Sequence, residues 1–236
     1  MDDILKIIDK NLSNEEIFQN LKNETCQDFE KIFSIINLDE LNSQEEFDIL
    51  IENLTDKPTP IREMTSIKLE EFKYTYSSYF LGDFAVEKIL KGIIDINPNV
   101  SRSICNIIIS NENLQNILEE KIIEKIDNLM QEIKKYEEET KDYFDKTIRN
   151  TKNHAKNKKL FSLYWYLEAL SCSISQKNNE KILNILTRTV NFLDYTIREK
   201  TAKILLALDN CPIDLIEKIR HDENFYVKNQ VYDKMN

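Results

Sequence analysis

Residues 43–62 read SQEEFDILIENLTDKPTPIR and contain one helix, a turn and the start of a second helix. Ser43 and Glu46 have the spacing of a capping box, in which two side chains satisfy backbone amides of the first turn. Four apolar residues that follow share one helical face: Phe47, Leu50, Ile51 and Leu54. A proline pair then breaks the chain, and Pro60 suits the first turn of the next helix. This stretch predicts a helical hairpin.

The same signals recur along the chain in both directions. Capping boxes are predicted at Ser13 with Glu16 and at Thr25 with Asp28. Helical periodicity predicts further helices over 60–76, 83–95, 99–110, 113–149, 158–174, 179–192, 195–208, 212–220 and 225–235. No segment shows sustained strand alternation bounded by hairpin turns. The fold class is therefore predicted to be all-α.

Four turns share one local pattern. In 56–62, 95–101 and 222–228, an Asp precedes a β-branched residue by five positions, and a polar or basic residue follows it. The segment 192–198 keeps the β-branched residue and the basic residue after it, but its Asp lies two positions later than in the other three segments. The four β-branched anchors are Ile61, Val100, Ile197 and Val227. Such recurrence indicates an internal repeat.

These turns resemble those of the HEAT repeat, a helical hairpin whose turn carries Asp and often Pro and whose second helix opens with Val-Arg. Ser101 and Lys228 depart from that pattern, as does Phe192, which stands where Asp is expected. The resemblance implies an α-solenoid of stacked helical hairpins over 43–236, with an acidic N-terminal helical cap over 1–42. It also implies that five residues hold neighbouring repeats together: Asp56, Arg62, Asp95, Arg198 and Asp222.

One long charged segment interrupts the repeat pattern. No Gly or Pro occurs between 113 and 149, and 132–139 is densely charged. Mixed charges three and four residues apart favour a solvent-facing helix. The segment is either one long helix or two helices without a strong breaker, and 111–158 is a candidate irregular insertion in the array.

The formal charge of −10 is unevenly distributed. Residues 1–60 hold 15 acids and 5 lysines, so the rest of the chain is neutral. This asymmetry indicates either an acidic interaction surface or a set of solvated helix faces. The overall acidity argues against a general affinity for nucleic acid.

The stretch 146–159 is strongly basic and contains no acid, and we expect a loop or a frayed helix end. Its six basic residues are Lys146, Arg149, Lys152, Lys156, Lys158 and Lys159. One hypothesis is an anionic-partner site in which Trp165 stacks on the ligand. Another is a solvated loop beside a buried tryptophan. A basic loop equally suits an acidic protein surface, or residues 1–60 of another copy.

Several function classes are excluded by composition. The two glycines, Gly82 and Gly92, are too few and too far apart for a phosphate-binding loop. The four cysteines lack metal-ligand spacing, which predicts buried free thiols in a reducing compartment. His154 lies in the basic stretch. His221 could pair with Asp222 or with Cys211, but adjacent residues seldom pair productively, and Cys211, which precedes Pro212 at a helix start, is expected to pack. We therefore predict no catalytic residue, metal or cofactor. No secretory signal or membrane span is evident either, so a cytoplasmic location without a membrane partner is expected.

The resemblance implies a non-enzymatic scaffold that binds another protein or peptide. One alternative is an enzyme similar to the alkylpurine DNA glycosylases, which are built on HEAT-like helices and need a basic concave face; only 146–159 and Trp165 support nucleic-acid binding. A second alternative is a HEAT-like lyase or chaperone that acts on a pigment or other protein-bound substrate. No marker residue for it is present.

Overall fold

The computed structural model describes residues 12–140, 146–174, 178–208 and 210–235, with the side chains of all except 139–140, 146–150, 152 and 232–235. Every regular element in these ranges is helical: twelve α-helices and one 3-10 helix. The prediction of an all-α fold is confirmed. The chain divides into two compact units, one ending at Leu114 and the other beginning at Gln115. The predicted division after residue 42 stays a prediction.

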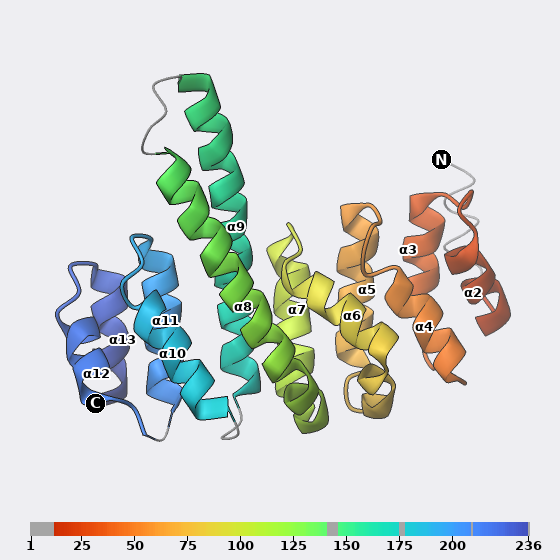
Figure 1. The fold of residues 1–236 in the computed structure, drawn as a ribbon. Helices are drawn as coiled ribbons and strands as arrows, with labels where there is room; N and C mark the ends of the chain where they lie inside the picture. Colours follow the sequence, from red (N-terminus) through yellow and green to blue (C-terminus); the bar gives the residue numbers. More distant parts are fainter. Residues whose placement is uncertain (1–11, 141–145, 175–177, 209, 236) are drawn as a thin grey trace. The chain divides into compact units, whose positions relative to one another are not determined.

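The first unit consists of helical hairpins (Figure 1). Its elements are α2 (Asn14–Lys22), α3 (Asp28–Ile36), α4 (Gln44–Glu52), α5 (Thr59–Glu71), the 3-10 helix η1 (Ser77–Leu81), α6 (Asp83–Ile93) and α7 (Pro98–Ile109). Helices α2, α4 and α6 contact one another in succession, as do α3, α5 and α7. These contacts form two layers, with one helix of each hairpin in each layer.

Local signals set the ends of these helices. Ser13 and Glu16 form the predicted capping box at the start of α2. The prediction of a cap at Thr25 was wrong: α3 begins after Gln27, whose backbone N–H donates to Glu30 at 2.9 Å. The helix predicted over 60–76 ends at Glu71, and its remainder leads into η1.

Gly92 allows two layers of the first unit to approach closely. A Cβ at this position would lie 3.1 Å from Cγ1 of Ile104 and 3.2 Å from Cδ2 of Leu54. Because both neighbours are fully buried, a larger side chain would overpack the core. This glycine therefore allows α6 to pack closely against α7 and the turn after α4.

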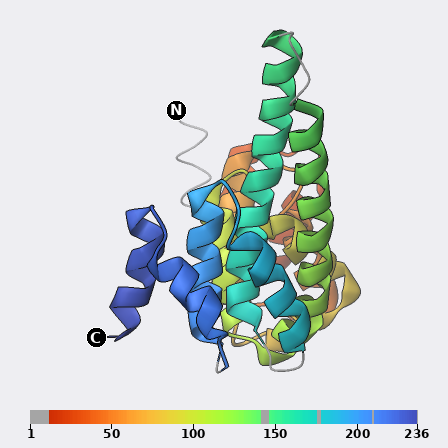
Figure 2. The ribbon, with the colours of Figure 1, turned by 60° about the vertical axis from the view of Figure 1, so that its left-hand side comes forward.

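The second unit is also built of hairpins. Its helices are α8 (Glu112–Thr140), which starts just before the boundary, α9 (Lys146–Ser173), α10 (Asn179–Thr189), α11 (Tyr195–Ala207), α12 (Ile213–Arg220) and α13 (Phe225–Met235). Helix α11 lies between α9 and α13 and contacts both (Figure 2). It also contacts α10 and α12. The central helix of this unit is therefore α11.

The long charged segment consists of two helices. Helix α8 ends at Thr140, and α9 begins at Lys146. The expectation of a loop or frayed end over 146–159 was wrong, because this stretch forms the first half of α9. Neither α8 nor any other described helix is long and apolar enough to cross a membrane.

Candidate functional site

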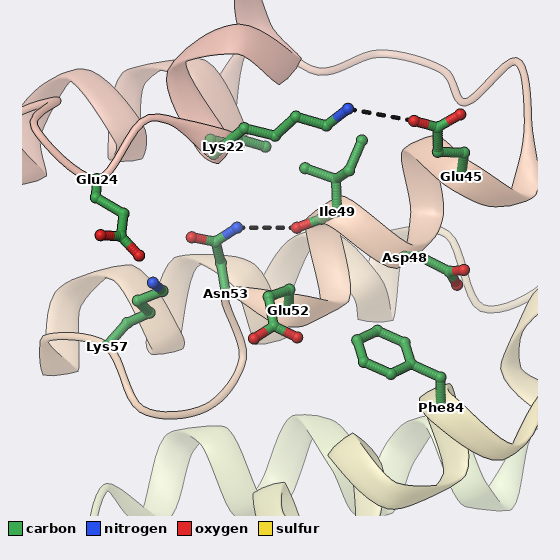
Figure 3. A pocket seen from close by; sticks show the side chains of 10 residues that line it. Lys22, Glu24, Glu45, Asp48, Ile49, Glu52, Asn53, Lys57 and Phe84 are labelled. Carbon is green, nitrogen blue, oxygen red and sulfur yellow. Dashed lines mark hydrogen bonds and ion pairs between the residues drawn. The ribbon is translucent and has the colours of Figure 1, made fainter.

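A hollow of about 450 Å³ opens on the first unit beside α4 (Figure 3). Helices α2, α4 and α6 and the turns after α2 and α4 supply its lining. The lining residues are Leu21, Lys22, Glu24, Glu45, Asp48, Ile49, Glu52, Asn53, Lys57 and Phe84. This volume lies within the range of roughly 300–1,000 Å³ typical of ligand pockets.

A second hollow of about 410 Å³ adjoins the first and shares Lys22, Glu45 and Ile49 with it. It adds five residues from α2 and the start of α4: Glu15, Phe18, Gln19, Ser43 and Glu46. We call the two hollows together the acidic groove. Their lining residues include six carboxylates and two lysines, a net formal charge of −4. The groove therefore attracts cations.

The carboxylates of α4 share one face because of their spacing. Glu45, Asp48 and Glu52 are three and four residues apart, whereas Phe47 and Leu50 point into the core. Like charges at these spacings destabilise a helix by roughly 0.2–0.5 kcal/mol per pair. The helix forms nonetheless, because its apolar face is fully buried.

Lysines compensate part of this charge. Lys22 lies 3.2 Å from Glu45, and both side chains are exposed. Lys88 of α6 lies 2.7 Å from Glu52 and donates to the Thr55 hydroxyl at 3.1 Å. Its ammonium also lies 5.3 Å from the ring centroid of Phe84. The charges of Glu24 and Lys57 have no ion-pair partner within 4.0 Å among the described residues.

Asn53, which ends α4, has an unpaired polar atom at this site. The residue is only 1% exposed, and its Nδ2 donates to the Ile49 carbonyl at 2.9 Å. Its Oδ1 is buried and accepts no hydrogen bond from the described part of the protein. Figure 3 shows this oxygen turned toward the side chains of Glu24 and Lys57. A buried acceptor without a donor costs about 1–3 kcal/mol.

The groove's lining favours an organic cation. It contains neither histidine nor cysteine. Among the residues that the structure describes, no three metal-ligating side chains cluster closely enough to hold a metal ion. A ligand that brings both positive charge and hydrogen-bond donors matches the carboxylates and the Asn53 oxygen.

The sequence matches no protein-family model and no curated protein.

The basic stretch is partly neutralised within the second unit. Lys159 lies 2.6 Å from Glu132, and Lys156 lies 3.8 Å from Glu137. Both glutamates belong to α8, so these lysines join α8 to α9. Lys158 is exposed. The side chains of the other three predicted residues, Lys146, Arg149 and Lys152, lie outside the described residues.

Trp165 is buried among aromatic side chains. It is 6% exposed, and its ring lies edge-on to those of Phe161 and Tyr164, with centroids 6.4 and 5.4 Å away. Its Nε1–H is buried without an acceptor in the described part of the chain. A nucleobase cannot stack on this ring in the observed arrangement.

Four of the five predicted repeat-stacking residues form two ion pairs. Arg62 contacts Asp95 at 2.6 Å, and Arg198 contacts Asp222 at 2.6 Å. The hydrogen bonds to Asp95 raise the pKa of Arg62, and the nearby charge of Asp56 adds to this effect. Asp56 itself occupies the turn with a positive φ of 59°, a conformation that Asp tolerates better than most residues.

The expectation that all four thiols are buried was wrong. Cys105 is buried, but Cys26, Cys172 and Cys211 are half-buried. Burial and a hydrogen bond to Glu30 raise the pKa of Cys26 to about 11. The Cys26 thiol is therefore protonated at neutral pH and is a poor nucleophile.

Proposed function

We propose that this chain is a non-enzymatic protein-binding protein and that the acidic groove binds a basic segment of a partner. The observation that carries the proposal is the charge of the groove, in which six carboxylates line adjoining hollows with two lysines. Of these carboxylates, Glu45 and Glu52 already pair with Lys22 and Lys88. A basic peptide would supply cations to the other four, and complementary charge favours both the encounter with the partner and its register.

The proposal includes a HEAT-like arrangement of hairpins in each unit. Two observations support it: the two-layer contacts in the first unit, and the Arg–Asp pairs, which link a helix to the turn before another. Repeats of this kind bury their apolar faces against neighbours and leave an extended surface for partners.

The alternative of a nucleic-acid enzyme has less support. Two of the three described lysines of the basic stretch pair with glutamates, and Trp165 is buried. The neighbourhood of these lysines is therefore less positive than the sequence suggests.

Fluorescence anisotropy with a labelled peptide of mixed arginine and lysine tests the proposal. The variant Glu45→Gln/Asp48→Asn/Glu52→Gln should weaken binding at least tenfold. The matched control neutralises three carboxylates of the first unit outside the groove: Glu70→Gln/Glu71→Gln/Glu87→Gln. An equal loss of affinity in both variants would show that binding depends only on net charge and would overturn the proposal. A gel shift with duplex DNA at low salt tests the alternative.

A further inference from the structure

We infer that the acidic groove takes an arginine side chain of its partner, with the guanidinium donating to Oδ1 of Asn53. This inference rests on the proposed function and makes it specific. It starts from two independent features of one site: the carboxylates of the groove, and a buried amide oxygen that accepts no hydrogen bond in the described protein.

The position of Asn53 explains why its oxygen has no partner. The residue caps α4, and its Nδ2 is committed to the Ile49 carbonyl at 2.9 Å. This bond fixes the orientation of the amide and directs Oδ1 away from the helix. In Figure 3 the oxygen faces the side of the hollow where Glu24 and Lys57 lie. Because this oxygen is buried, neighbouring side chains must move before a donor entering from that side can satisfy it.

The neighbouring groups match a guanidinium better than an ammonium. Guanidinium is planar and carries five N–H donors in a fixed fork, whereas ammonium is a compact point charge with three donors. One guanidinium can therefore donate to Asn53 and to a groove carboxylate at once. Glu24 and Glu52 are the carboxylates on either side of Asn53 in Figure 3.

Phe84 supplies an aromatic surface at the same hollow. Its side chain is 42% exposed, and the ring lies near Glu52 and Asp48 in Figure 3. Arginine stacks on aromatic faces more readily than lysine does. Lys88 already lies 5.3 Å from the ring centroid, so a cation is accommodated on one side of this ring.

The test compares three capped, fluorescein-labelled glycine–serine peptides that differ at one repeated position, which is arginine, lysine or neutral citrulline. We expect the arginine peptide to bind about tenfold more tightly than the lysine peptide, the effect of one hydrogen bond between a neutral and a charged group. Citrulline should bind most weakly. Equal affinity for arginine and lysine would overturn the arginine assignment but leave the proposed function intact. If neither peptide bound, both would fail.

Two variants separate recognition from folding. Asn53→Ala should abolish the preference for arginine over lysine. Asn37→Ala is the matched control, because Asn37 ends α3 and its Nδ2 donates to the Phe33 carbonyl at 2.8 Å, yet it does not line the groove. If Asn53→Ala kept the preference, the assignment would be wrong.

An NMR measurement on the unaltered chain tests the inference without relying on the Asn53→Ala variant. The side-chain amide signal of Asn53 in a ¹⁵N-correlated NMR spectrum should shift when the arginine peptide is added, and less with the lysine peptide. No shift at saturation would overturn the inference. Free arginine should compete only weakly, and competition as strong as that of the peptide would overturn the assignment to a protein partner.

Discussion

Arg62 donates two parallel hydrogen bonds to Asp95, from Nε to Oδ2 at 2.6 Å and from Nη2 to Oδ1 at 2.9 Å. The two side chains are only 13% and 8% exposed. The same guanidinium donates through Nη1 to the carbonyl of Lys57. One side chain of α5 therefore joins the turn before α5 to the turn before α7.

The second unit repeats this arrangement. Arg198 of α11 donates to both oxygens of Asp222, at 2.6 and 3.0 Å, and to the carbonyls of Phe192 and Leu193. In both units the Asp also accepts from the backbone of an Asn two residues later, Asn97 or Asn224, at 2.8 Å. The two units thus use the same device to fix the turn that precedes a helix.

Removing one partner of the first pair should destabilise the first unit. Because Asp95 is almost fully buried, Arg62→Ala leaves a charge without compensation, and we expect a loss of about 3–5 kcal/mol. Urea unfolding, together with hydrogen exchange of the amides in 57–62 and 95–97, measures it. The control is Arg102→Ala in the same unit, since Arg102 is exposed. Similar losses in both variants would show that the paired geometry contributes little.

The second pair predicts a dependence on pH. Burial acts to raise the pKa of Asp222, but hydrogen bonds from Arg198 and the Asn224 backbone outweigh it and hold the pKa below its usual 3.8. A carboxyl with a lowered folded-state pKa stabilises the protein above its unfolded pKa, and this contribution is lost as the pH falls through the folded value. Asp222→Asn should therefore cost about 2–4 kcal/mol at pH 7, and the difference should shrink below about pH 4.

Thermal unfolding of the two chains between neutral and acidic pH checks this expectation. Asp214→Asn is the control, because Asp214 is exposed on α12 of the same unit. A stability difference that stays constant down to pH 3 would contradict the assignment of this contribution to the charge of Asp222.

The helix positions were largely predictable because they depend on local signals. Helices α6, α11 and α13 begin at the predicted residues 83, 195 and 225, where turn residues precede an apolar face. The helicity of 150–157 was missed, since Asn150, Asn153 and Asn157 are weak helix formers. Lys156 and Lys159 face glutamates of α8. Such tertiary contacts cannot be detected from the periodicity of apolar residues in the sequence.

The candidate site was predictable only in part. The sequence shows that 1–60 is acidic and that Glu45, Asp48 and Glu52 share a helical face. It does not show that α2 and α6 bring Glu24 and Phe84 to that face. Nor does it show that the oxygen of Asn53 lacks a donor, because that depends on how every neighbour packs.

A three-residue charge network should stabilise the second unit. Glu168 of α9 lies 2.6 Å from Lys200 and 2.8 Å from Lys203, both of α11. Lys200 is 15% exposed, and its ammonium lies 4.7 Å from the Tyr164 ring centroid. Glu168→Gln keeps the shape but removes the charge, so we expect a loss of about 2–3 kcal/mol. Urea unfolding compares this loss of stability with that of the control Glu180→Gln on α10. A smaller loss in Glu168→Gln than in the control would contradict the prediction.

Removal of Lys57 should strengthen the binding of a basic peptide. Its ammonium lines the acidic groove near the unpaired oxygen of Asn53 (Figure 3), where it repels an incoming cation and occupies part of its place. We expect Lys57→Ala to increase affinity for the arginine peptide about threefold to tenfold at low salt, since one like charge is removed from a partly screened site. The gain should fall as salt is added.

Lys73→Ala is the matched control for this prediction, because it changes the net charge of the first unit equally and lies outside the groove, 3.6 Å from Glu70. Anisotropy titrations of both variants at two salt concentrations separate a local effect from net charge. If Lys57→Ala instead weakened binding, Lys57 would belong to the recognition surface, and the carboxylates would have to recognise a ligand that carries negative as well as positive groups.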